Sequence, residues 1–398
     1  MTTHRWRAAL FARPVRPLRS RGRGRTAGNF MRILVFTSYN NLLQSAAALA
    51  TACHAARRGA RVLLASVGPG HLVGALLGQS LGSRPLELEP HLAAMEINPI
   101  EEIGNRWEEV RSTLRGNFVN RLREIGSEEL PAFAGMDATA ALLVAERARQ
   151  TGRFDLLIFD GPTPDTLIRS MGLPDSLRWL LRLVFGLDRG PGRSRLSQEM
   201  ALIPATLLAP SALAPLQDLR VNLEEHRARF DGVTGTRVRM VVTPEELHLP
   251  AVRQALMALG FHGLAMDELV VAGQLSEVDE TSRREFSPET GDVRPHLRVG
   301  PLPTRPADRD TWALRGAALY RDGDIYSPTA PSRPPVGERE VRLYIPFMDP
   351  KSLDLALVSE EVVVRLGEQR RHILLPGIAE GGRLRARVEG EVLRLWVE

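Results

Sequence analysis

Short apolar runs alternate with amphipathic stretches over residues 31–325. The apolar runs that predict strands are residues 32–36, 61–66, 155–159, 237–242 and 268–271. One intervening helix is predicted from apolar side chains at helical spacing, which should bury one face: Ile103, Trp107, Val110 and Leu114. Strands that alternate with helices are typical of a mostly parallel sheet with helices on its faces. The pattern therefore predicts an α/β domain over residues 31–325.

The start of a later helix is marked by residues that commonly cap helices. Thr243 can cap the first turn, Pro244 fits the first helical position, and Glu246 can complete a capping box. Gly260 can end the helix after Leu259, because glycine readily adopts the conformation that terminates helices. These residues predict a strand, a turn and a helix in succession, as an α/β unit requires.

The amino-acid composition of the chain changes at residues 326–338, YSPTAPSRPPVGE. Four prolines and few apolar residues predict a stiff linker there. Beyond it, apolar side chains alternate with the period of half-buried strands: Val341, Leu343 and Ile345, then Leu353, Leu355 and Leu357. Further strands are predicted at residues 361–366, 372–375 and 392–397. Residues 339–398 are therefore expected to form a small all-β sandwich.

Positive charge is concentrated at the beginning of the chain. Residues 1–30 contain eight arginines and no acidic residue, so the formal net charge of +5 leaves −3 for the other 368 residues. Clustered arginines attract phosphates, so an arm that binds nucleic acid or a membrane surface is one interpretation, and a targeting peptide is another. We favour a third interpretation, a disordered basic tail or a segment upstream of the true start. On this interpretation we expect no binding to nucleic acid.

Neither a membrane span nor a cysteine-based site is predicted. The longest uncharged stretch, residues 200–217, is broken by Pro204, Pro210 and Pro215, and it is short for a bilayer. Cys53 is the one cysteine of the chain, which excludes an intramolecular disulfide and a zinc or metalloid site built from several cysteines. We expect no integral membrane segment, no metal and a cytoplasmic location, because a reducing compartment suits this cysteine usage.

The first predicted strand leads into residues 38–45, SYNNLLQS, where a nucleotide-binding loop would lie. Loops of the form GxxxxGK[ST] use glycines to bring backbone N–H groups near phosphate and a lysine to reach its outer oxygens. Of that pattern only Ser45 is present, and the single lysine of the chain, Lys351, lies in its last sixty residues. A phosphate-loop lysine is therefore excluded.

The surroundings of this loop resemble one known family. RILVFTSYNNLLQSA at 32–46, RRG at 57–59 and RVLLAS at 61–66 are similar to RILVFTGKGGVGKTT, RRG and a strand in the ArsA-type anion-transporting ATPases. Further similarities follow in the same order: MEINP at 95–99 resembles LEIDP, DLLIFDGPTPDTL at 155–167 resembles the strand and switch segment, and LPDSLRWL at 173–180 resembles LPETLRWL. The resemblance covers most of residues 31–325 and implies a P-loop NTPase-like fold.

The departures from this family fall on its chemistry. The resemblance aligns the signature lysine with Tyr39, the second lysine with Gln44, the switch aspartate with Gly68 and the base-reading asparagine with Ala272, whereas Ser45 and Asp160 match the family. It thus implies a vestigial nucleotide pocket that includes Tyr39, Gln44, Ser45 and Asp160. From the residues alone we favour simpler roles, with Asp160 a solvated residue at the end of a strand and Ser45 a helix-entry residue.

We expect ATP hydrolysis to be lost, because removing even one charge-stabilising donor typically costs roughly 100- to 1,000-fold in rate. The first hypothesis is a homologue that needs no cofactor and acts as a scaffold, regulatory partner or protein-binding factor. The alternative is a divergent but active ATPase that binds ATP and Mg²⁺. As protein partners we consider an active ArsA-like paralogue or an apolar protein client, and we expect a homo- or heterodimer.

Residues 339–398 resemble the α-crystallin-like domain of small heat-shock proteins, which some bacterial members of the ATPase family carry at this end. The similarity rests on the order of strands, on LLP at 374–376 and on the closing GEVLRLWV at 390–397. The resemblance implies either protein binding through exposed strand edges and an intersheet groove, or a domain that only folds and packs. Both interpretations stay open at this point.

Overall fold

The computed structural model describes residues 31–68, 70–113, 124–132, 135–172, 236–287, 293–321, 325, 340–358, 361–375 and 382–398. Several sequence predictions fall outside these ranges. They are the basic tail at 1–30, the segments 173–180 and 200–217, the position of Leu114 and the linker at 326–338. The structural statements below concern the described residues.

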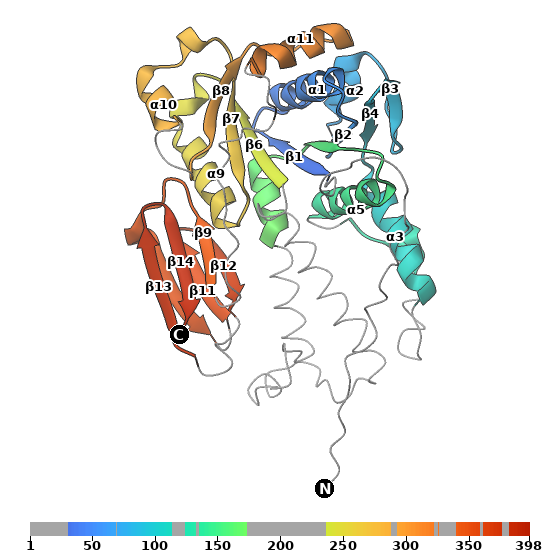
Figure 1. Ribbon diagram of the computed structural model, residues 1–398. Coiled ribbons are helices and arrows are strands. Elements are labelled where there is room, and N and C mark those ends of the chain that lie inside the picture. Colours follow the sequence, from blue (N-terminus) through green and yellow to red (C-terminus); the bar gives the residue numbers. More distant parts are fainter. Residues whose placement is uncertain are drawn as a thin grey trace, which may run out of the picture. The chain divides into compact units, whose positions relative to one another are not determined.

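The first domain is built on one eight-stranded sheet (Figure 1). Its strands are β1 (Arg32–Thr37), β2 (Val62–Ser66), β3 (Leu86–Glu89), β4 (Leu92–Glu96), β5 (Leu156–Asp160), β6 (Thr236–Val242), β7 (Met266–Ala272) and β8 (His296–Gly300). Their order is β3-β4-β2-β5-β1-β6-β7-β8, and every pair is parallel except β3–β4. All five predicted strands are confirmed with ends shifted by at most two residues, whereas β3, β4 and β8 were not predicted. The α/β fold class is thus confirmed.

Helices cover both faces of this sheet (Figure 1). They are α1 (Asn41–Arg57), α2 (Leu72–Leu77), α3 (Pro99–Thr113), α5 (Met136–Thr151), α9 (Pro250–Phe261), α10 (Glu280–Glu285) and α11 (Arg309–Leu319). Side chains alternate along β1, so that Leu34 and Phe36 pack with α1, α2 and α11 on one face while Val35 packs with α5 and α9 on the other. The predicted helix around Ile103 and Trp107 is confirmed as α3, but these two side chains are half-buried.

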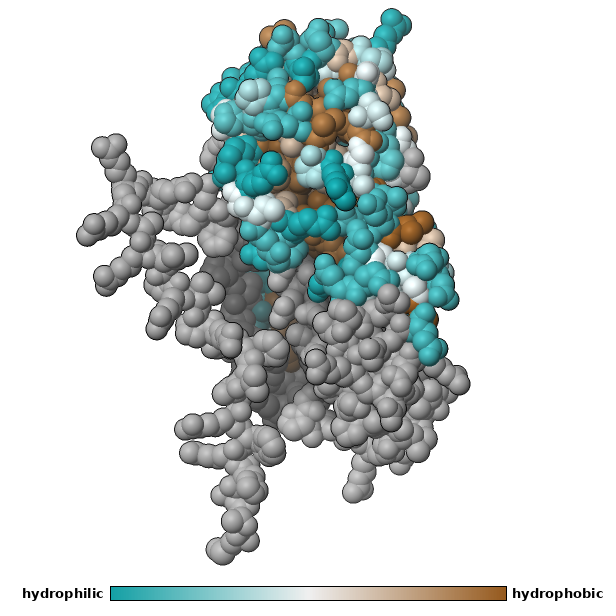
Figure 2. Space-filling view, turned by 90° about the vertical axis from the view of Figure 1, so that its right-hand side faces the viewer, coloured by the Kyte–Doolittle hydropathy of each residue, from teal (hydrophilic) through white to brown (hydrophobic). Residues whose placement is uncertain are grey.

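On the side of the domain that carries β3 and α3, the coloured surface is mostly hydrophilic (Figure 2). Apolar residues lie among the hydrophilic ones, and two exposed examples from this part of the chain are Leu86 of β3 and Ile100 of α3. None of the described helices is both long enough and apolar enough to span a bilayer.

The predicted capping box forms, but it does not begin the long helix. The backbone N–H of Thr243 donates to Glu246 Oε2 at 2.8 Å, and the N–H of Glu246 donates to Thr243 Oγ1 at 3.4 Å. These bonds close the short 3₁₀ turn η5 (Glu246–His248), and α9 begins only at Pro250. Leu249 is extended, as expected of a residue before proline, and this separates the two elements. The prediction that the helix starts near Pro244 was therefore wrong.

Gly260 lies inside α9, so the prediction that it ends the helix was also wrong. A Cβ atom at this position would lie 2.5 Å from the backbone oxygen of Tyr344 and 2.7 Å from Cδ of Pro346. Glycine is needed here because α9 comes into direct backbone contact with the carboxyl-terminal module.

The carboxyl-terminal module consists of two three-stranded antiparallel sheets. One has the order β10 (Leu353–Val358), β11 (Glu361–Leu366) and β12 (Gln369–Leu374); the other has the order β13 (Leu384–Glu389), β14 (Val392–Val397) and β9 (Glu340–Tyr344). Both contribute to one buried apolar cluster, which confirms the predicted all-β sandwich; β13 was not predicted.

Two sets of contacts attach this module to the first domain. Phe261, at the end of α9, is fully buried in the apolar cluster of the module, and its backbone oxygen accepts a 2.8 Å hydrogen bond from Arg371. Before β8, Arg294 pairs with Glu391 at 2.9 Å and its guanidinium lies 4.4 Å from the ring centre of Phe347. The module is therefore packed onto the end of α9 and the approach to β8.

A buried ionic network ties β6 and β7 to the end of α11. Arg239 is fully buried and donates to both carboxylate oxygens of Asp267, at 3.0 and 2.8 Å. It also pairs with Glu268 at 3.1 Å, donates to the hydroxyl of Tyr320 at 2.8 Å and reaches the backbone oxygen of Ile325. A buried charge of this kind is tolerated because it has partners on every side.

Candidate functional site

The carboxyl ends of β1, β2 and β5 meet at one edge of the sheet. Asp160 is the last residue of β5, and it is in register with Phe36 of β1 and Ser66 of β2. Its side chain is buried, with only 3% of the residue surface exposed. The expectation that Asp160 is a solvated residue was therefore wrong.

Neutral side chains satisfy the Asp160 carboxylate. The amide of Gln44 donates to Asp160 Oδ1 at 2.7 Å and also to the backbone oxygen of Gly161 at 2.5 Å. The hydroxyls of Ser45 and Ser66 both donate to Asp160 Oδ2, at 2.7 and 3.0 Å. We call Gln44, Ser45, Ser66 and Asp160 the carboxylate cluster. Ser45 contributes from within α1, not from its entry position.

Burial raises the pKa of Asp160 above its ordinary value, although the hydrogen bonds from Gln44, Ser45 and Ser66 and the charge of His71 act to lower it. Gln44 Oε1, within the cluster, and His71 Nδ1 are buried and have no hydrogen-bond partner among the described residues. The cluster thus holds its carboxylate with neutral donors, in a buried setting that raises the pKa of Asp160.

The turn between β1 and α1 is held by its own side chains. The hydroxyl of Ser38 donates to the backbone oxygen of Val241 at 2.6 Å and accepts from the N–H of Asn40 at 2.9 Å. Asn40 in turn caps α1, because its side-chain oxygen accepts from the N–H of Leu43 at 3.2 Å. Protein groups therefore already occupy some of the donors that a helix start can offer to an anion.

Tyr39 lies apart from the carboxylate cluster. It is 45% exposed, and its hydroxyl donates to Asp165 at 3.4 Å. Of the four residues that the sequence placed in one pocket, the structure thus brings together Gln44, Ser45 and Asp160. Ser66 was missed; its one signal in the sequence is its position at the end of a strand that runs parallel to β5.

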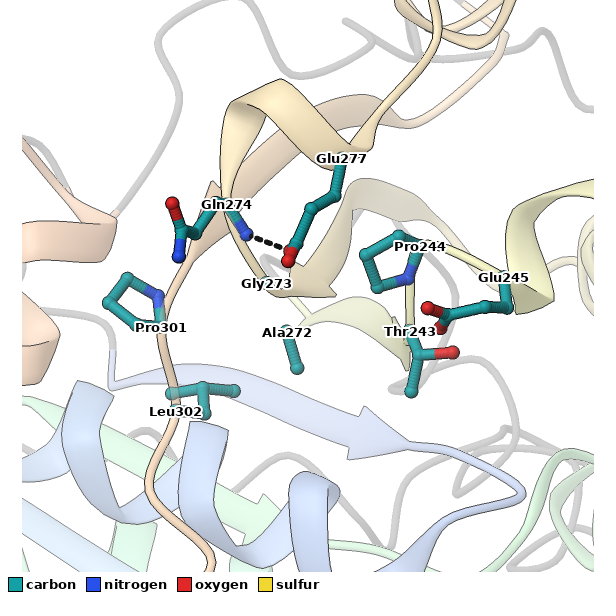
Figure 3. A pocket seen from close by; sticks show the side chains of 9 residues that line it. All are labelled: Thr243, Pro244, Glu245, Ala272, Gly273, Gln274, Glu277, Pro301 and Leu302. Carbon is teal, nitrogen blue, oxygen red and sulfur yellow. Dashed lines mark hydrogen bonds between the residues drawn. The ribbon is translucent and has the colours of Figure 1, made fainter.

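A separate pocket of about 360 Å³ opens at the carboxyl ends of β6, β7 and β8 (Figure 3). It is lined by Thr243, Pro244, Glu245, Ala272, Gly273, Gln274, Glu277, Pro301 and Leu302. Glycine is required at position 273 of this lining, because a Cβ there would lie 2.7 Å from both Glu277 Oε2 and Pro244 Cγ. Ala272, the residue aligned with the base-reading asparagine, lies in this pocket.

No group of three or more histidine, cysteine or carboxylate side chains within the described ranges is arranged to hold a metal ion. Cys53 is buried, and burial raises the pKa of its thiol to about 12.

The sheet is mostly parallel, and its first strand leads directly into a buried helix. An aspartate ends the neighbouring strand beside this turn. Together these features define a P-loop NTPase-like protein. The model of the anion-transporting ATPase family matches residues 31–288, so the chain belongs to that family. The model of the HSP20-like domain found in ArsA matches residues 337–395. Both resemblances seen in the sequence are thus confirmed.

Several known proteins are similar to this chain over most of their length. The "Putative arsenical pump-driving ATPase" of Prosthecochloris vibrioformis is 26% identical over 371 residues, which cover 87% of this chain and 90% of that protein. The protein with the same description from Chlorobaculum tepidum has the same identity and coverage. The "Putative arsenical pump-driving ATPase 1" of Aquifex aeolicus is 23% identical over 380 residues, covering 87% of this chain and 94% of that protein.

Proposed function

We propose that this anion-transporting ATPase homologue has lost ATP hydrolysis and acts as a scaffold or regulatory partner that binds another protein. The observation that carries the proposal is the closed carboxylate cluster. Gln44 stands where the resemblance places the second loop lysine, and its neutral amide donates to Asp160 at 2.7 Å. The position of a phosphate-binding cation is thereby used to hold a carboxylate.

The chemistry of P-loop NTPases supports this reading of the site. Those enzymes hold Mg²⁺ with a loop serine or threonine and an aspartate, and they place a lysine and backbone N–H groups on the phosphates. Residues 38–45 contain no lysine and no glycine. Ser45 and Asp160 are bonded to each other at 2.7 Å, and the raised pKa of Asp160 opposes the ionised form that a divalent cation requires.

ATP hydrolysis and calorimetric titration with ATP and Mg²⁺ test the proposal. We expect no turnover above the buffer rate, and no change when Asp160 is replaced in the variant Asp160→Asn. Asp165→Asn is the matched control, because Asp165 lies on the same side of the sheet but bonds to Tyr39 and is outside the cluster. Turnover that disappears in Asp160→Asn and persists in Asp165→Asn would refute the loss of hydrolysis.

The alternative function, a divergent ATPase that binds ATP and Mg²⁺, is favoured by the pocket at the ends of β6, β7 and β8. The resemblance implies that a nucleotide base binds there. Titration with adenosine and with ATP separates the two functions. A working ATPase should bind ATP more tightly than adenosine, and its binding of ATP should depend on Mg²⁺. A pocket that retains only base binding should bind ATP and adenosine equally, with or without Mg²⁺.

The partner in this proposal is an active relative with an intact phosphate loop, a second copy of the chain, or an apolar client. Light scattering of the purified chain, alone and mixed with an active relative, tests the first two. A monomer in both samples would leave client binding as the remaining form of the scaffold function.

A further inference from the structure

Three arginines lie in one row across the outer face of the sheet formed by β13, β14 and β9. In the strand register, Arg394 of β14 is opposite Arg387 of β13 on one side and Arg342 of β9 on the other. The neighbouring Leu343, Leu393 and Leu395 are buried in the sandwich core, so the arginines point to the opposite face. Like charges directly opposite each other destabilise a sheet unless counter-charges are supplied. We call Arg342, Arg394 and Arg387 the arginine row.

Glu340 shows how the arginine row holds a carboxylate. Arg394 donates to both of its carboxylate oxygens, at 2.6 and 3.0 Å, and Arg342 donates to one of them at 2.7 Å. These hydrogen bonds hold the pKa of Glu340 below its ordinary value. Two guanidinium groups therefore converge on one carboxylate, with one positive charge in excess.

The other end of the row is open to a ligand. Arg387 has a side chain that is 68% exposed, and it forms an ion pair with Glu389 of the same strand at 3.2 Å. Arg394 lies 5.0 Å from the ring centre of Trp396, on the same face. Arginine and tryptophan together are enriched at protein interfaces, where they supply much of the binding energy.

We propose that the arginine row binds an acidic segment of a partner protein, with one of its carboxylates held by Arg387 and by Nη1 of Arg394, the nitrogen that Glu340 does not use. Adjacent strands are about 4.8 Å apart, so the two gaps in the row offer a carboxylate similar spacing. Guanidinium groups bind carboxylates in the forked geometry that Glu340 already displays. The excess charge is small, which suits a few carboxylates: the same face also carries Arg385, so four arginines face Glu340, Glu389 and Glu398.

Nucleic acids and anionic membranes fit this face less well. A nucleic-acid site typically neutralises about 6–10 phosphates, and a membrane-binding patch typically presents about 4–8 basic residues. The face of the row carries Arg385 in addition to the three arginines, and Glu340, Glu389 and Glu398 beside them leave one positive charge in excess. This inference rests on the proposed function in one respect, namely that the chain binds another protein. It does not depend on the loss of ATP hydrolysis, which concerns the carboxylate cluster and not the arginine row.

Fluorescence anisotropy of the full chain with a labelled hexaglutamate peptide tests the proposal, with hexaglutamine as the neutral control peptide. The wild type should bind the glutamate peptide and not the glutamine peptide, and high salt should weaken the binding. Arg387→Gln should weaken it by roughly threefold to fivefold, since an exposed charge pair contributes up to about 1 kcal/mol. Arg365→Gln is the matched control: Arg365 lies on β11 in the other sheet, is 52% exposed and pairs with Asp354.

A third variant should change the affinity in the opposite direction. Glu340→Gln removes the internal carboxylate that competes for Arg342 and Arg394, so it should bind the glutamate peptide more tightly than the wild type does. If Glu340→Gln unfolds at a lower temperature than the wild type, the comparison of Arg387→Gln with Arg365→Gln still decides the outcome.

Three results would overturn the proposal. The first is the absence of peptide binding in the wild type, and the second is equal affinity of Arg387→Gln and Arg365→Gln for the peptide. The third is binding of a labelled oligothymidylate, or of vesicles that contain phosphatidylserine, that is tighter than binding of the peptide and that Arg387→Gln weakens. None of these results bears on ATP turnover, so failure here is distinguishable from failure of the proposed loss of hydrolysis.

Discussion

Replacement of Gly260 by alanine tests the contact between α9 and the carboxyl-terminal module. The added Cβ would lie 2.5 Å from the backbone oxygen of Tyr344 and 2.7 Å from Cδ of Pro346. Comfortable contacts between such atoms begin at about 3.5 Å, so β9 and α9 must move apart by about 1 Å. Neither neighbour is the end of a flexible side chain, and the overlap therefore cannot be relieved by a rotamer change.

Two opposing effects set the magnitude for Gly260→Ala. Alanine is favoured over glycine in a helix by up to about 1 kcal/mol. Forcing an extra carbon into a closely packed contact costs about 1–3 kcal/mol, and the upper half of that range applies where backbone must move. We expect the packing cost to exceed the helix gain, so that the free energy of unfolding falls by about 1–2 kcal/mol.

Urea denaturation of the full chain measures this difference, with Gly172→Ala as the matched control. Gly172 is also helical, but a Cβ there meets no atom of the described part of the chain within 4 Å, so the control should be neutral or slightly stabilised. If Gly260→Ala is as stable as the wild type, the close approach of α9 to β9 does not exist in solution and the packing argument fails.

Three other perturbations test separate features. Arg239→Met should lower the free energy of unfolding by about 3–5 kcal/mol in urea titrations, because it leaves Asp267 buried without its cation and Glu268 with Arg298 alone; a loss below 1 kcal/mol would contradict the network. Burial raises the pKa of Asp160 above its ordinary 3.8, so the stabilising contribution of this carboxyl is complete below that value and is lost as the pH rises through the folded pKa. The unfolding free energy of the wild type minus that of Asp160→Asn should accordingly decrease from about pH 4 upward, and an increase would show that the hydrogen bonds outweigh burial. The pKa of Cys53 is raised to about 12 by burial. Its alkylation by iodoacetamide at pH 8, followed by mass spectrometry, should therefore be slower in the native chain than in urea by at least roughly three orders of magnitude, and comparable rates would show that the thiol is accessible.

The sequence predicted the parts of the fold whose side chains follow the usual burial pattern. β1 and β5 were predicted because they are short apolar runs, as central parallel strands are. β8 was missed because its polar residues interrupt the run, and Arg298 is accommodated there because it pairs with Glu268 of β7 and donates to the backbone oxygen of Leu319. That pairing depends on the order of strands, which the local sequence does not contain.

The candidate site shows the same limit. The resemblance to the family indicated Gln44 and Asp160, but the hydrogen bond between them joins residues 116 positions apart. The contribution of Ser66 follows from the register of β2 on β5, and the outward position of Tyr39 follows from the geometry of the turn. Long-range register and turn conformation were therefore what the residues alone could not supply.

The burial of Phe261 within the sandwich core has a practical consequence for anyone who dissects this protein. A fragment that stops at the proline-rich segment would carry an uncovered phenylalanine at the end of α9, and the excised sandwich would lose the aromatic ring that completes its interior. Each half would expose an apolar surface and tend to precipitate, so protein for biochemical experiments should contain both halves on one polypeptide.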